Sequence, residues 1–351
     1  MEESIEKDSN IIDTVENDMS EEIIEEVIEE PEVDLSVSQL KGVGAKTEEK
    51  LINFGVTSLL DLCVRGAKEI SEITGVAKDT AKSWIFMAHK LLEENGMIRK
   101  SDMPTKELLT YQLNHRRLKC GAKEVDELFG GGLTPEAVYE VYGEFGSGKT
   151  QFCMSVTAET LANNGKVIWI DCEDTFKPQR LVEILKSREL VVDEEAAIET
   201  LDNIKYFHTP TTEQLTGTVD SLSKLMREEK TDLLVIDGSI GQFREEYLGR
   251  GTLAERQNEI ARLMTHIKNI SYYFRCTVVF TNQVQSDPAI MFGDPIKPIG
   301  GNIVAHASTY RTYFKKSGKN RIARMVDSPE HKQMDASFIL NEKGISDKDE
   351  E

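Results

Sequence analysis

The apolar positions of this chain follow two different patterns. Residues 35–95 carry apolar side chains at helical spacing, for example in the run from 81 to 92. From about residue 121, short continuous apolar runs alternate with longer amphipathic stretches; the short runs lie at 137–142, 166–170, 233–236 and 276–280. Short buried strands separated by helices are typical of a parallel sheet covered by helices on both faces. The pattern predicts a small all-α domain followed by an α/β domain.

Breakers and charge mark the boundaries of these parts. Gly96 and Pro104 lie in a polar stretch between the two patterned regions, which predicts a linker. We therefore expect an acidic tail at 1–34, an all-α domain at 35–95, a linker at 96–120, an α/β core at 121–346 and a short acidic tail at 347–351.

The net charge of −20 is concentrated at the N-terminus. Residues 1–34 hold fifteen acidic side chains and one Lys, a net of −14, which leaves −6 for the remaining 317 residues. So few large apolar residues and so much self-repulsion predict a disordered tail. A solvating role is favoured over an acidic arm that competes with nucleic acid for basic surface or contacts a partner.

Cysteine usage and hydropathy indicate the class of compartment. The five cysteines are scattered without a C-x-x-C pair, so the sequence predicts neither a zinc site nor a disulfide framework. The N-terminus does not resemble a signal peptide, and no apolar run approaches the ~20 residues that cross a bilayer. We expect a soluble intracellular protein without a membrane partner.

Two glycine-containing hairpins are expected in the all-α region, at 40–46 and 73–78. Helices joined through Gly-apolar-Gly expose backbone amides that, beside Lys41 and Lys46, can hold a DNA phosphate without reading sequence. This arrangement resembles a helix-hairpin-helix domain. The second copy has Ala77 where the first has Gly44, which favours a packing role for it. A protein-docking module is the alternative for the first copy.

The most informative segment fits G-x-x-x-x-G-K-[ST] and lies between an apolar run and a stretch with helical spacing. Glycines let backbone amides curl around the phosphates of a nucleotide, while the Lys reaches the β and γ phosphates and the Thr hydroxyl binds Mg²⁺. The motif predicts binding of ATP or GTP. Its residues are Gly143, Glu144, Phe145, Gly146, Ser147, Gly148, Lys149 and Thr150.

Carboxylates at strand ends are the next candidates. Asp237 ends the run 233–236, where an acid lies beside the Mg²⁺ and its waters, although a lone strand-end Asp is often only a turn former. Asp171 and Glu173 follow the run 166–170, at the sheet edge that faces the ligand crevice in open α/β sheets. Glu173 is thus a candidate to orient and deprotonate the attacking water.

Two further segments follow strands of the predicted sheet. Gln283, after the last run, is placed to hydrogen-bond the γ-phosphate or the attacking water, and the Pro- and Gly-rich stretch 285–302 after it predicts a functional loop. The segment 243–251 combines two Arg with an aromatic residue and glycines, which fits single-stranded nucleic acid. A solvated loop with Arg paired to Glu245 and Glu246 explains it equally well.

Together these segments resemble the archaeal RadA recombinases, relatives of bacterial RecA and of the eukaryotic recombinases. The resemblance covers about residues 36–346. Its most specific pieces lie at 143–151, 247–257, 281–284, 297–309 and 327–329. It implies a RecA-type P-loop ATPase core with a twisted, mainly parallel sheet, preceded by a small all-α helix-hairpin-helix domain.

The resemblance also implies roles for residues at the nucleotide, with ATP and Mg²⁺ as cofactors. Glu173 would be the catalytic base, and Gln283 and His306 would couple the γ-phosphate to DNA. Thr150 and, through water, Asp237 would hold Mg²⁺. The ATP site would be completed by Arg180, which stacks on adenine, and by Asp327 and Pro329, which cap the nucleotide of a neighbouring subunit.

DNA would be bound by two loops, at 243–252 and 285–301. The residues implied on or near the filament axis are Arg244, Tyr247, Arg250, Arg256, Gly300 and Gly301.

The chain departs from the family pattern in the linker. In this family an F-x-x-A element inserts Phe and Ala into the next subunit, whereas residues 101–106 contain neither. Assembly by that contact is therefore in question, with Met103 or Ile98 as weaker substitutes. The segment 330–334 after the cap also differs from the family's acidic, Pro-containing continuation, and Lys177 and Gln179 replace the more usual Arg and Glu.

From this resemblance we expect an ATP-dependent DNA recombinase, a DNA-dependent ATPase that binds single-stranded DNA as a filament and catalyses homologous pairing and strand exchange in DNA repair. The partners would be single- and double-stranded DNA, further copies of the chain in a filament or ring, and mediator proteins. The alternative is a recombinase paralogue that regulates filaments without strand exchange; a helicase would need translocation motifs that the sequence lacks. We expect an archaeal, nucleoid-associated protein of the cytoplasm.

Overall fold

The computed structural model describes residues 35–247, 249, 251–286 and 296–348. The predicted tail 1–34, the end of the tail 347–351, Arg250 and residues 287–295 of the second loop therefore lie outside the described residues. The described residues belong to one compact unit, Leu35–Glu351. None of its helices combines the length and the apolarity that crossing a bilayer requires, as far as the described residues go.

The first part of this unit is all helical. Its core gathers apolar side chains such as Leu51, Leu62 and Trp84, all almost fully buried. A capping box at Ser58, completed by Asp61, starts the third of its helical segments. The elements are η1 (Val37–Gln39), α2 (Ala45–Asn53), α3 (Leu59–Val64), α4 (Ala67–Thr74) and α5 (Lys78–Glu94).

Both expected hairpins are present in this part. Gly42 and Gly75 have φ of 95° and 79°, the left-handed backbone that only glycine adopts without strain. The second hairpin joins α4 to α5, while the first enters α2 from the short η1. The Trp84 indole N–H donates to the carbonyl of Lys41 (3.3 Å), so a core side chain fixes the first hairpin.

The segment between the two patterned regions contains a helix that the polar composition does not predict. α6 (Thr105–Leu113) leaves Leu109 and Leu113 exposed (55% and 74%) and buries none of its residues. Ile98, expected as a substitute contact for a neighbouring subunit, is 3% exposed in the core of the helical part. That expectation is wrong, because a side chain packed inside its own subunit cannot fill a pocket on another.

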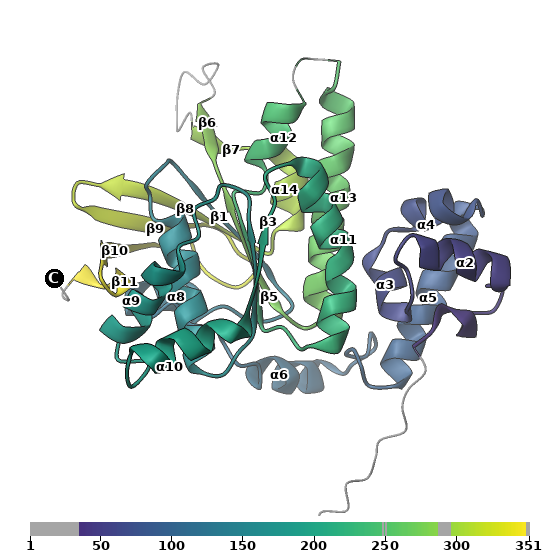
Figure 1. Cartoon of the computed structure of the whole chain (residues 1–351), viewed down its shortest axis with the longest axis horizontal. Coiled ribbons are helices and arrows are strands. Elements are labelled where there is room, and N and C mark those ends of the chain that lie inside the picture. Colours follow the sequence, from purple (N-terminus) through teal and green to yellow (C-terminus); the bar gives the residue numbers. More distant parts are fainter. Residues whose placement is uncertain (1–34, 248, 250, 287–295, 349–351) are drawn as a thin grey trace, which may run out of the picture. The chain divides into compact units, whose positions relative to one another are not determined.

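A nine-stranded sheet organises the rest of the chain (Figure 1). The strand order is β11-β10-β9-β8-β1-β5-β4-β2-β3, in which the six strands from β8 to β3 run parallel and β9, β10 and β11 add to the edge antiparallel. The strands are β1 (Val138–Gly143), β2 (Val167–Asp171), β3 (Ile204–His208), β4 (Leu233–Asp237), β5 (Thr277–Asn282), β8 (Tyr310–Ser317), β9 (Asn320–Asp327), β10 (Asp335–Asn341) and β11 (Gly344–Ser346), with a separate ribbon of β6 (Val284–Ser286) and β7 (Ile296–Pro298).

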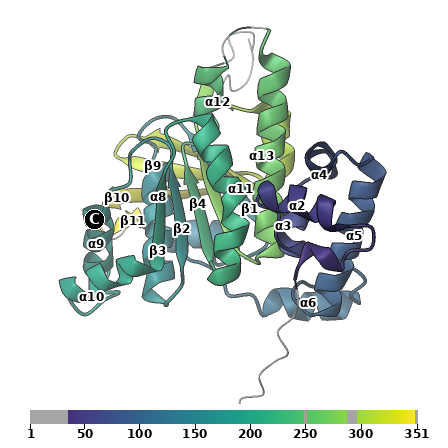
Figure 2. The same cartoon turned by 45° about the vertical axis from the view of Figure 1, so that its right-hand side comes forward.

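Helices cover both faces of the sheet, each over its own apolar cluster. One cluster joins β-strand residues such as Trp169 to Phe152 and Leu181, and the other joins Ile236 to Leu263. Figure 2 shows α11 and α13 side by side on the second face. The helices are α7 (Lys123–Leu128), α8 (Lys149–Ala162), α9 (Pro178–Ser187), α10 (Glu194–Glu199), α11 (Thr212–Glu228), α12 (Gly241–Glu246), α13 (Leu253–Tyr273) and α14 (Gly301–Ala307), with a 3-10 turn η2 (Thr200–Asn203).

The predicted mainly parallel sheet is confirmed, and the four expected strands are β1, β2, β4 and β5, with ends that differ by one or two residues. The expectation omits β3, the parallel strand β8 and the antiparallel strands β9–β11. β3 is an edge strand with half-buried and exposed positions, so it lacks a continuous apolar run. The turn between β8 and β9 contains Gly318 at a φ of 63°, a hairpin signal that the sequence does offer.

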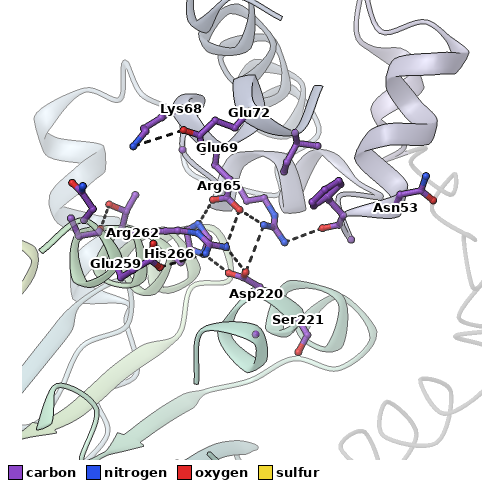
Figure 3. A pocket seen from close by; sticks show the side chains of 18 of the residues that line it. Asn53, Arg65, Lys68, Glu69, Glu72, Asp220, Ser221, Glu259, Arg262 and His266 are labelled. Atoms are coloured by element: carbon purple, nitrogen blue, oxygen red, sulfur yellow. Dashed lines mark hydrogen bonds and ion pairs between the residues drawn. The ribbon is translucent and has the colours of Figure 1, made fainter. Parts of the chain in front are cut away.

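A cluster of charged side chains joins α4 to α11 and α13 at the wall of a cavity of about 920 Å³ (Figure 3). The His266 ring is 2% exposed, with Nδ1 2.8 Å from the Asp220 carboxylate and Nε2 2.8 Å from the Glu69 carboxylate. Arg262 reaches both carboxylates, at 2.5 and 3.2 Å, and Arg65 pairs with Glu69. Because both ring nitrogens face carboxylates, which only accept, the geometry requires the doubly protonated imidazolium.

Candidate functional site

The phosphate loop leaves β1 at its carboxyl end and enters α8. All six residues of β1 are buried, which fixes the start of the loop in the centre of the sheet. A Cβ on Gly143 would lie 2.1 Å from the carbonyl oxygen of Phe314, and Gly146 and Gly148 have φ of 72° and 103°. Only glycine fits these positions, and the buried Ser147 hydroxyl finds no hydrogen-bond partner among the described residues. The loop thus fits a phosphate group that would accept from it.

Lys149 lies at the first position of α8 with its ammonium turned back over the loop. Its Nζ donates to the carbonyls of Gly143 (2.9 Å) and Glu144 (3.1 Å). Burial lowers the pKa of Lys149, and the nearby carboxylates of Glu173 and Asp237 oppose this effect. A lysine held by weak carbonyl acceptors is ready to exchange them for phosphate oxygens.

Asp237 ends β4 and is 2% exposed. Its carboxylate accepts from the hydroxyls of Thr150 (2.8 Å), Thr281 (2.5 Å) and Thr175 (3.2 Å). Burial raises the pKa of Asp237, while the hydroxyl from Thr281 and then that from Thr150 lower it. The strand-end carboxylate is therefore joined to the Thr that the motif assigns to Mg²⁺, and the turn-former alternative does not account for this contact.

Glu173 and Asp171 have different environments, although both follow β2. Asp171 is fully buried and accepts from the backbone N–H groups of Glu173 (3.1 Å), Thr175 (3.2 Å) and Phe176 (2.9 Å), so it holds the turn together. Glu173 is exposed, and its carboxylate accepts from the Gln283 amide (2.8 Å). The structure thus leaves Glu173 as the carboxylate available to a water molecule.

Gln283 lies directly after β5, at the start of the second expected DNA loop. Its side chain also lies against the start of α12, because a Cβ on Gly241 would be 3.6 Å from its amide carbon. The amide that could sense a phosphate is therefore in contact with the candidate base and with the first element of the first loop.

Arg180 lies on α9 beside the phosphate-loop helix. Its Nε donates to Gln151 (3.0 Å), the residue after Thr150, and its guanidinium also contacts the carbonyls of Asn341 and Glu342. These bonds fix the position of the side chain at the wall of the site. Its predicted stacking on adenine remains a prediction.

The first expected DNA loop lies between α12 and α13. Arg244 is exposed and forms no ion pair with another described residue, and Tyr247 stacks on Phe243 with ring centroids 6.3 Å apart. Glu246 caps α11 by accepting from the N–H (2.8 Å) and hydroxyl of Thr212, and it forms no ion pair with an Arg among the described residues. Arg256 lies on the first turns of α13. The described part of this loop therefore leaves a cation facing outward.

The end of the second expected loop leads into α14. Gly300 has a φ of 96°, and a Cβ there would lie 2.3 Å from Val304 and 3.2 Å from Ile240. Gly300 is thus required by backbone conformation and close packing, whereas Gly301 adopts the left-handed conformation, with a φ of 59°, in open space. His306 is exposed on α14 and forms no hydrogen bond with another described residue, so the structure does not join it to Gln283.

Asp327 and Pro329 are exposed and lie at the other end of the sheet from the phosphate loop. β1 and β8 run parallel, and Phe314 of β8 pairs with Gly143 at the carboxyl end of β1. Asp327 pairs instead with Arg311, near the amino end of β8. Within one chain these two residues therefore do not reach the nucleotide bound by its own loop.

Three residues near the site were not singled out from the sequence. The Thr281 hydroxyl donates to the Asp237 carboxylate and accepts from the backbone N–H of Gly238 (2.8 Å). A Cβ on Gly238 would lie 2.5 Å from the Glu173 side chain, so this glycine makes room for the candidate base. Lys316 lies beside the loop, where its Nζ would be 3.0 Å from a Cβ on Gly146. Gly238 could have been found from the sequence, because it directly follows the strand-end Asp237. Lys316 could not, because its place depends on β8, which was not predicted.

The fold and the loop define a P-loop nucleotide-binding protein of the α/β class, with the motif on a central strand of a mainly parallel sheet. The Rad51 family profile matches residues 113–348, and the profile described as a SAM-like helix-hairpin-helix tandem matches residues 34–90. The chain belongs to the Rad51 family, and within it to the RadA recombinases.

Two relatives place the chain more closely. The DNA repair and recombination protein RadA of Cenarchaeum symbiosum is 40% identical over 321 residues, which covers 90% of this chain and 79% of the relative. The DNA repair and recombination protein RadA of Methanoculleus marisnigri is 37% identical over 328 residues, which covers 89% of this chain and 98% of the relative. The similarity thus extends through both the helical part and the sheet.

Proposed function

We propose that this protein is an ATP-dependent DNA recombinase, which binds single-stranded DNA as a filament and catalyses homologous pairing and strand exchange in DNA repair. One observation carries the proposal. The phosphate loop, Glu173 and Gln283 lie at the same edge of the sheet as the bases of the two expected DNA loops, 243–252 and 285–301. Membership of the Rad51 family supports the same conclusion.

ATP would bind to the loop with its phosphates among the N–H groups of residues 143–150. Lys149 would exchange the carbonyls of Gly143 and Glu144 for phosphate oxygens. Mg²⁺, when bound, would neutralise charge on the phosphates. Thr150 would hold the ion through its hydroxyl, which the hydrogen bond to Asp237 orients, and the Asp237 carboxylate would accept from a water on the ion.

Hydrolysis would use Glu173 as the base. The carboxylate is exposed at the end of β2 and can accept a proton from a water aligned with the γ-phosphate. Before nucleotide binds, the Gln283 amide donates to the same carboxylate. A γ-phosphate would compete for this amide and free the base, so nucleotide binding and activation of the base would occur together.

Assembly follows from the position of the cap. Asp327 and Pro329 lie at the opposite end of the sheet from the chain's own loop, so a nucleotide that they cap would belong to another subunit. We propose that ATP lies at the contact between subunits. The exposed Arg244 at the first loop would then neutralise DNA phosphates along the filament.

The test is strand exchange between a circular single strand and a homologous duplex, with ATP, Mg²⁺ and the full chain. We expect exchanged product with homologous DNA only, together with filaments visible by electron microscopy in a slowly hydrolysed ATP analogue. The Lys149→Ala variant, which loses the ammonium at the β and γ phosphates, should give neither. Wild-type protein that stays monomeric with both ligands and makes no product would contradict the proposal.

A further inference from the structure

A buried polar network lies under the phosphate loop and takes no part in the steps above. Glu140, in the middle of β1, is 1% exposed. Its carboxylate accepts from Nε of Arg311 on β8 (2.6 Å) and from Nδ2 of Asn282 at the end of β5 (2.8 Å). Burial raises the pKa of Glu140, and Arg311 is the largest opposing influence. The carboxylate is thus anchored from both neighbouring strands.

Asn282 carries this network out of the sheet. Its Nδ2 donates a second hydrogen bond, to the carbonyl of Ile299 (2.8 Å), while the N–H of Ile299 donates to the carbonyl of Gln283 (3.1 Å). Ile299 is therefore held on both sides by two consecutive residues of the chain. The amide oxygen of Asn282 is buried and has no hydrogen-bond partner among the described residues, so the side chain is oriented by its two donor contacts.

This point closes the base of the second loop. β6 follows Gln283 and pairs antiparallel with β7, which ends directly before Ile299. The next residue, Gly300, packs without a side chain against Ile240 and Val304. The ribbon β6–β7 thus leaves and rejoins the sheet at one place, and the Asn282 side chain bridges its two ends.

We propose that Glu140 and Asn282 are positioning residues that make Gln283 and the described base of the second loop, residues 284–286 and 296–301, move as one body, so that the nucleotide state of the phosphate loop sets the affinity of the protein for single-stranded DNA. The inference rests on the proposed function, since it names the contacts through which ATP and DNA are coupled.

The two residues can transmit a shift because the side chain and the backbone of Gln283 are held with different strength. Its side chain is exposed and, among the residues that the structure describes, has one hydrogen bond, to Glu173, which a phosphate can replace. Its backbone is tied through Ile299 and Asn282 to the buried Glu140 carboxylate, and this charge-assisted contact is costly to break because a buried ion would lose one of its two partners. A shift at the phosphate therefore moves the β6–β7 ribbon rather than deforming its base.

The experiment compares the affinity of the full-length protein for a fluorescent single strand with an ATP analogue and with ADP. We expect the wild type to show a ratio of about 5 to 150, the usual range of allosteric coupling, and Asn282→Ala to lower that ratio at least about fivefold. Binding of the ATP analogue without DNA should change less than about twofold, because Asn282 does not face the phosphates. Thr157→Val removes a buried hydroxyl of α8 outside the network and should keep the full ratio.

Each other outcome is also decisive. A folded Asn282→Ala protein that retains the wild-type ratio overturns the inference and leaves the proposed function intact. A wild type with equal DNA affinity in both nucleotide states overturns the proposed function, and the inference with it. If Asn282→Ala does not fold by circular dichroism, Asn282→Ser, whose single hydroxyl cannot donate to Glu140 and Ile299 together, replaces it with the same expectation.

Discussion

Single residues at the phosphate loop are held in contacts that a nucleotide can replace. Lys149 donates to two carbonyls of its own loop, and burial lowers its pKa although Glu173 and Asp237 oppose the shift. Bound phosphates would add negative charge beside the ammonium and raise that pKa again. Glu173 likewise shares a hydrogen bond with Gln283 that is exposed to solvent. The groups that this chain offers at its own phosphate loop therefore require little rearrangement to bind a phosphate.

Glu173→Gln should slow ATP hydrolysis by about two orders of magnitude or more, the contribution expected of a general base. The amide oxygen of the new side chain can still accept from Gln283, so ATP and DNA binding should be retained and filaments should persist longer. Steady-state ATPase with saturating single-stranded DNA measures the effect.

Asp174→Asn is the matched control. Asp174 is an exposed carboxylate next to Glu173 at a φ of 55°, a backbone conformation that Asn tolerates as well as Asp. It should hydrolyse ATP at nearly the wild-type rate. A rate loss below about threefold in Glu173→Gln would move the search for the base elsewhere.

Two elements bring the two expected DNA loops close to the phosphate loop. α12 starts at Gly241, against the Gln283 side chain, and the β6–β7 ribbon starts directly after Gln283. The Glu246 carboxylate caps α11, and Arg244 on α12 forms no ion pair with another described residue. Its charge is therefore available to an external partner. The distance between loop and phosphate site is thus set by the short helix α12 and by the end of β5.

Arg244→Ala should weaken binding of single-stranded DNA and lower the slope of log affinity against log salt by roughly 0.7, the value for one phosphate contact on a single strand. Binding of ATP without DNA should not change. Fluorescence anisotropy from low to moderate salt measures both quantities.

Lys230→Ala removes an equal charge at the amino end of β4, away from the loops, and should leave the salt slope unchanged. Equal slopes for wild type and Arg244→Ala would show that this Arg does not contact DNA phosphates.

At the scale of the whole molecule, one buried imidazolium ties a helix of the helix-hairpin-helix part to the ATPase part. Burial disfavours the charged ring, but the carboxylates of Asp220 and Glu69 outweigh it and raise the pKa of His266. Burial also opposes ionisation of Glu69, yet His266, Arg65 and Arg262 together lower its pKa to about 2. The cluster therefore stabilises contacts between parts of the chain that are remote in sequence.

His266→Gln should lower the free energy of unfolding by about 3 kcal/mol near pH 6, the lower end of the range for removing one partner from a buried pair, because water reaches the cavity at its wall. Urea unfolding of wild type and variant measures the difference. Lys68→Gln, at the same cavity but in an exposed pair with Glu72, should change stability by less than about 1 kcal/mol.

The pH dependence of this difference has a definite sign. The His266 contribution is fully present below its ordinary pKa of 6.5 and is lost as pH rises through its raised value. The Glu69 contribution is present above its ordinary value of 4.5 and is lost as pH falls toward about 2. The stability difference between wild type and His266→Gln should therefore shrink at alkaline pH; a difference that grows there would contradict the imidazolium assignment.

The sequence by itself determined the class of fold and the place of several candidate residues for the nucleotide site at one edge of the sheet. Continuous apolar runs identify β1, β2, β4 and β5 because central parallel strands are buried on both faces. The phosphate loop, Asp237 and Glu173 are predictable because each lies at or just after the carboxyl end of such a strand, and the carboxyl ends of parallel strands meet at one edge. These are local signals, which need no knowledge of the rest of the chain.

Only the tertiary structure decided which remote groups share a contact. The hairpin strands β8 and β9 were missed, and they place Lys316 beside the loop, Arg311 against Glu140 and Asp327 away from the chain's own phosphate site. The linker helix α6 likewise has no clear apolar face to predict it. Pairing between residues more than a hundred positions apart depends on the register of strands and on packing, which no short window of sequence contains.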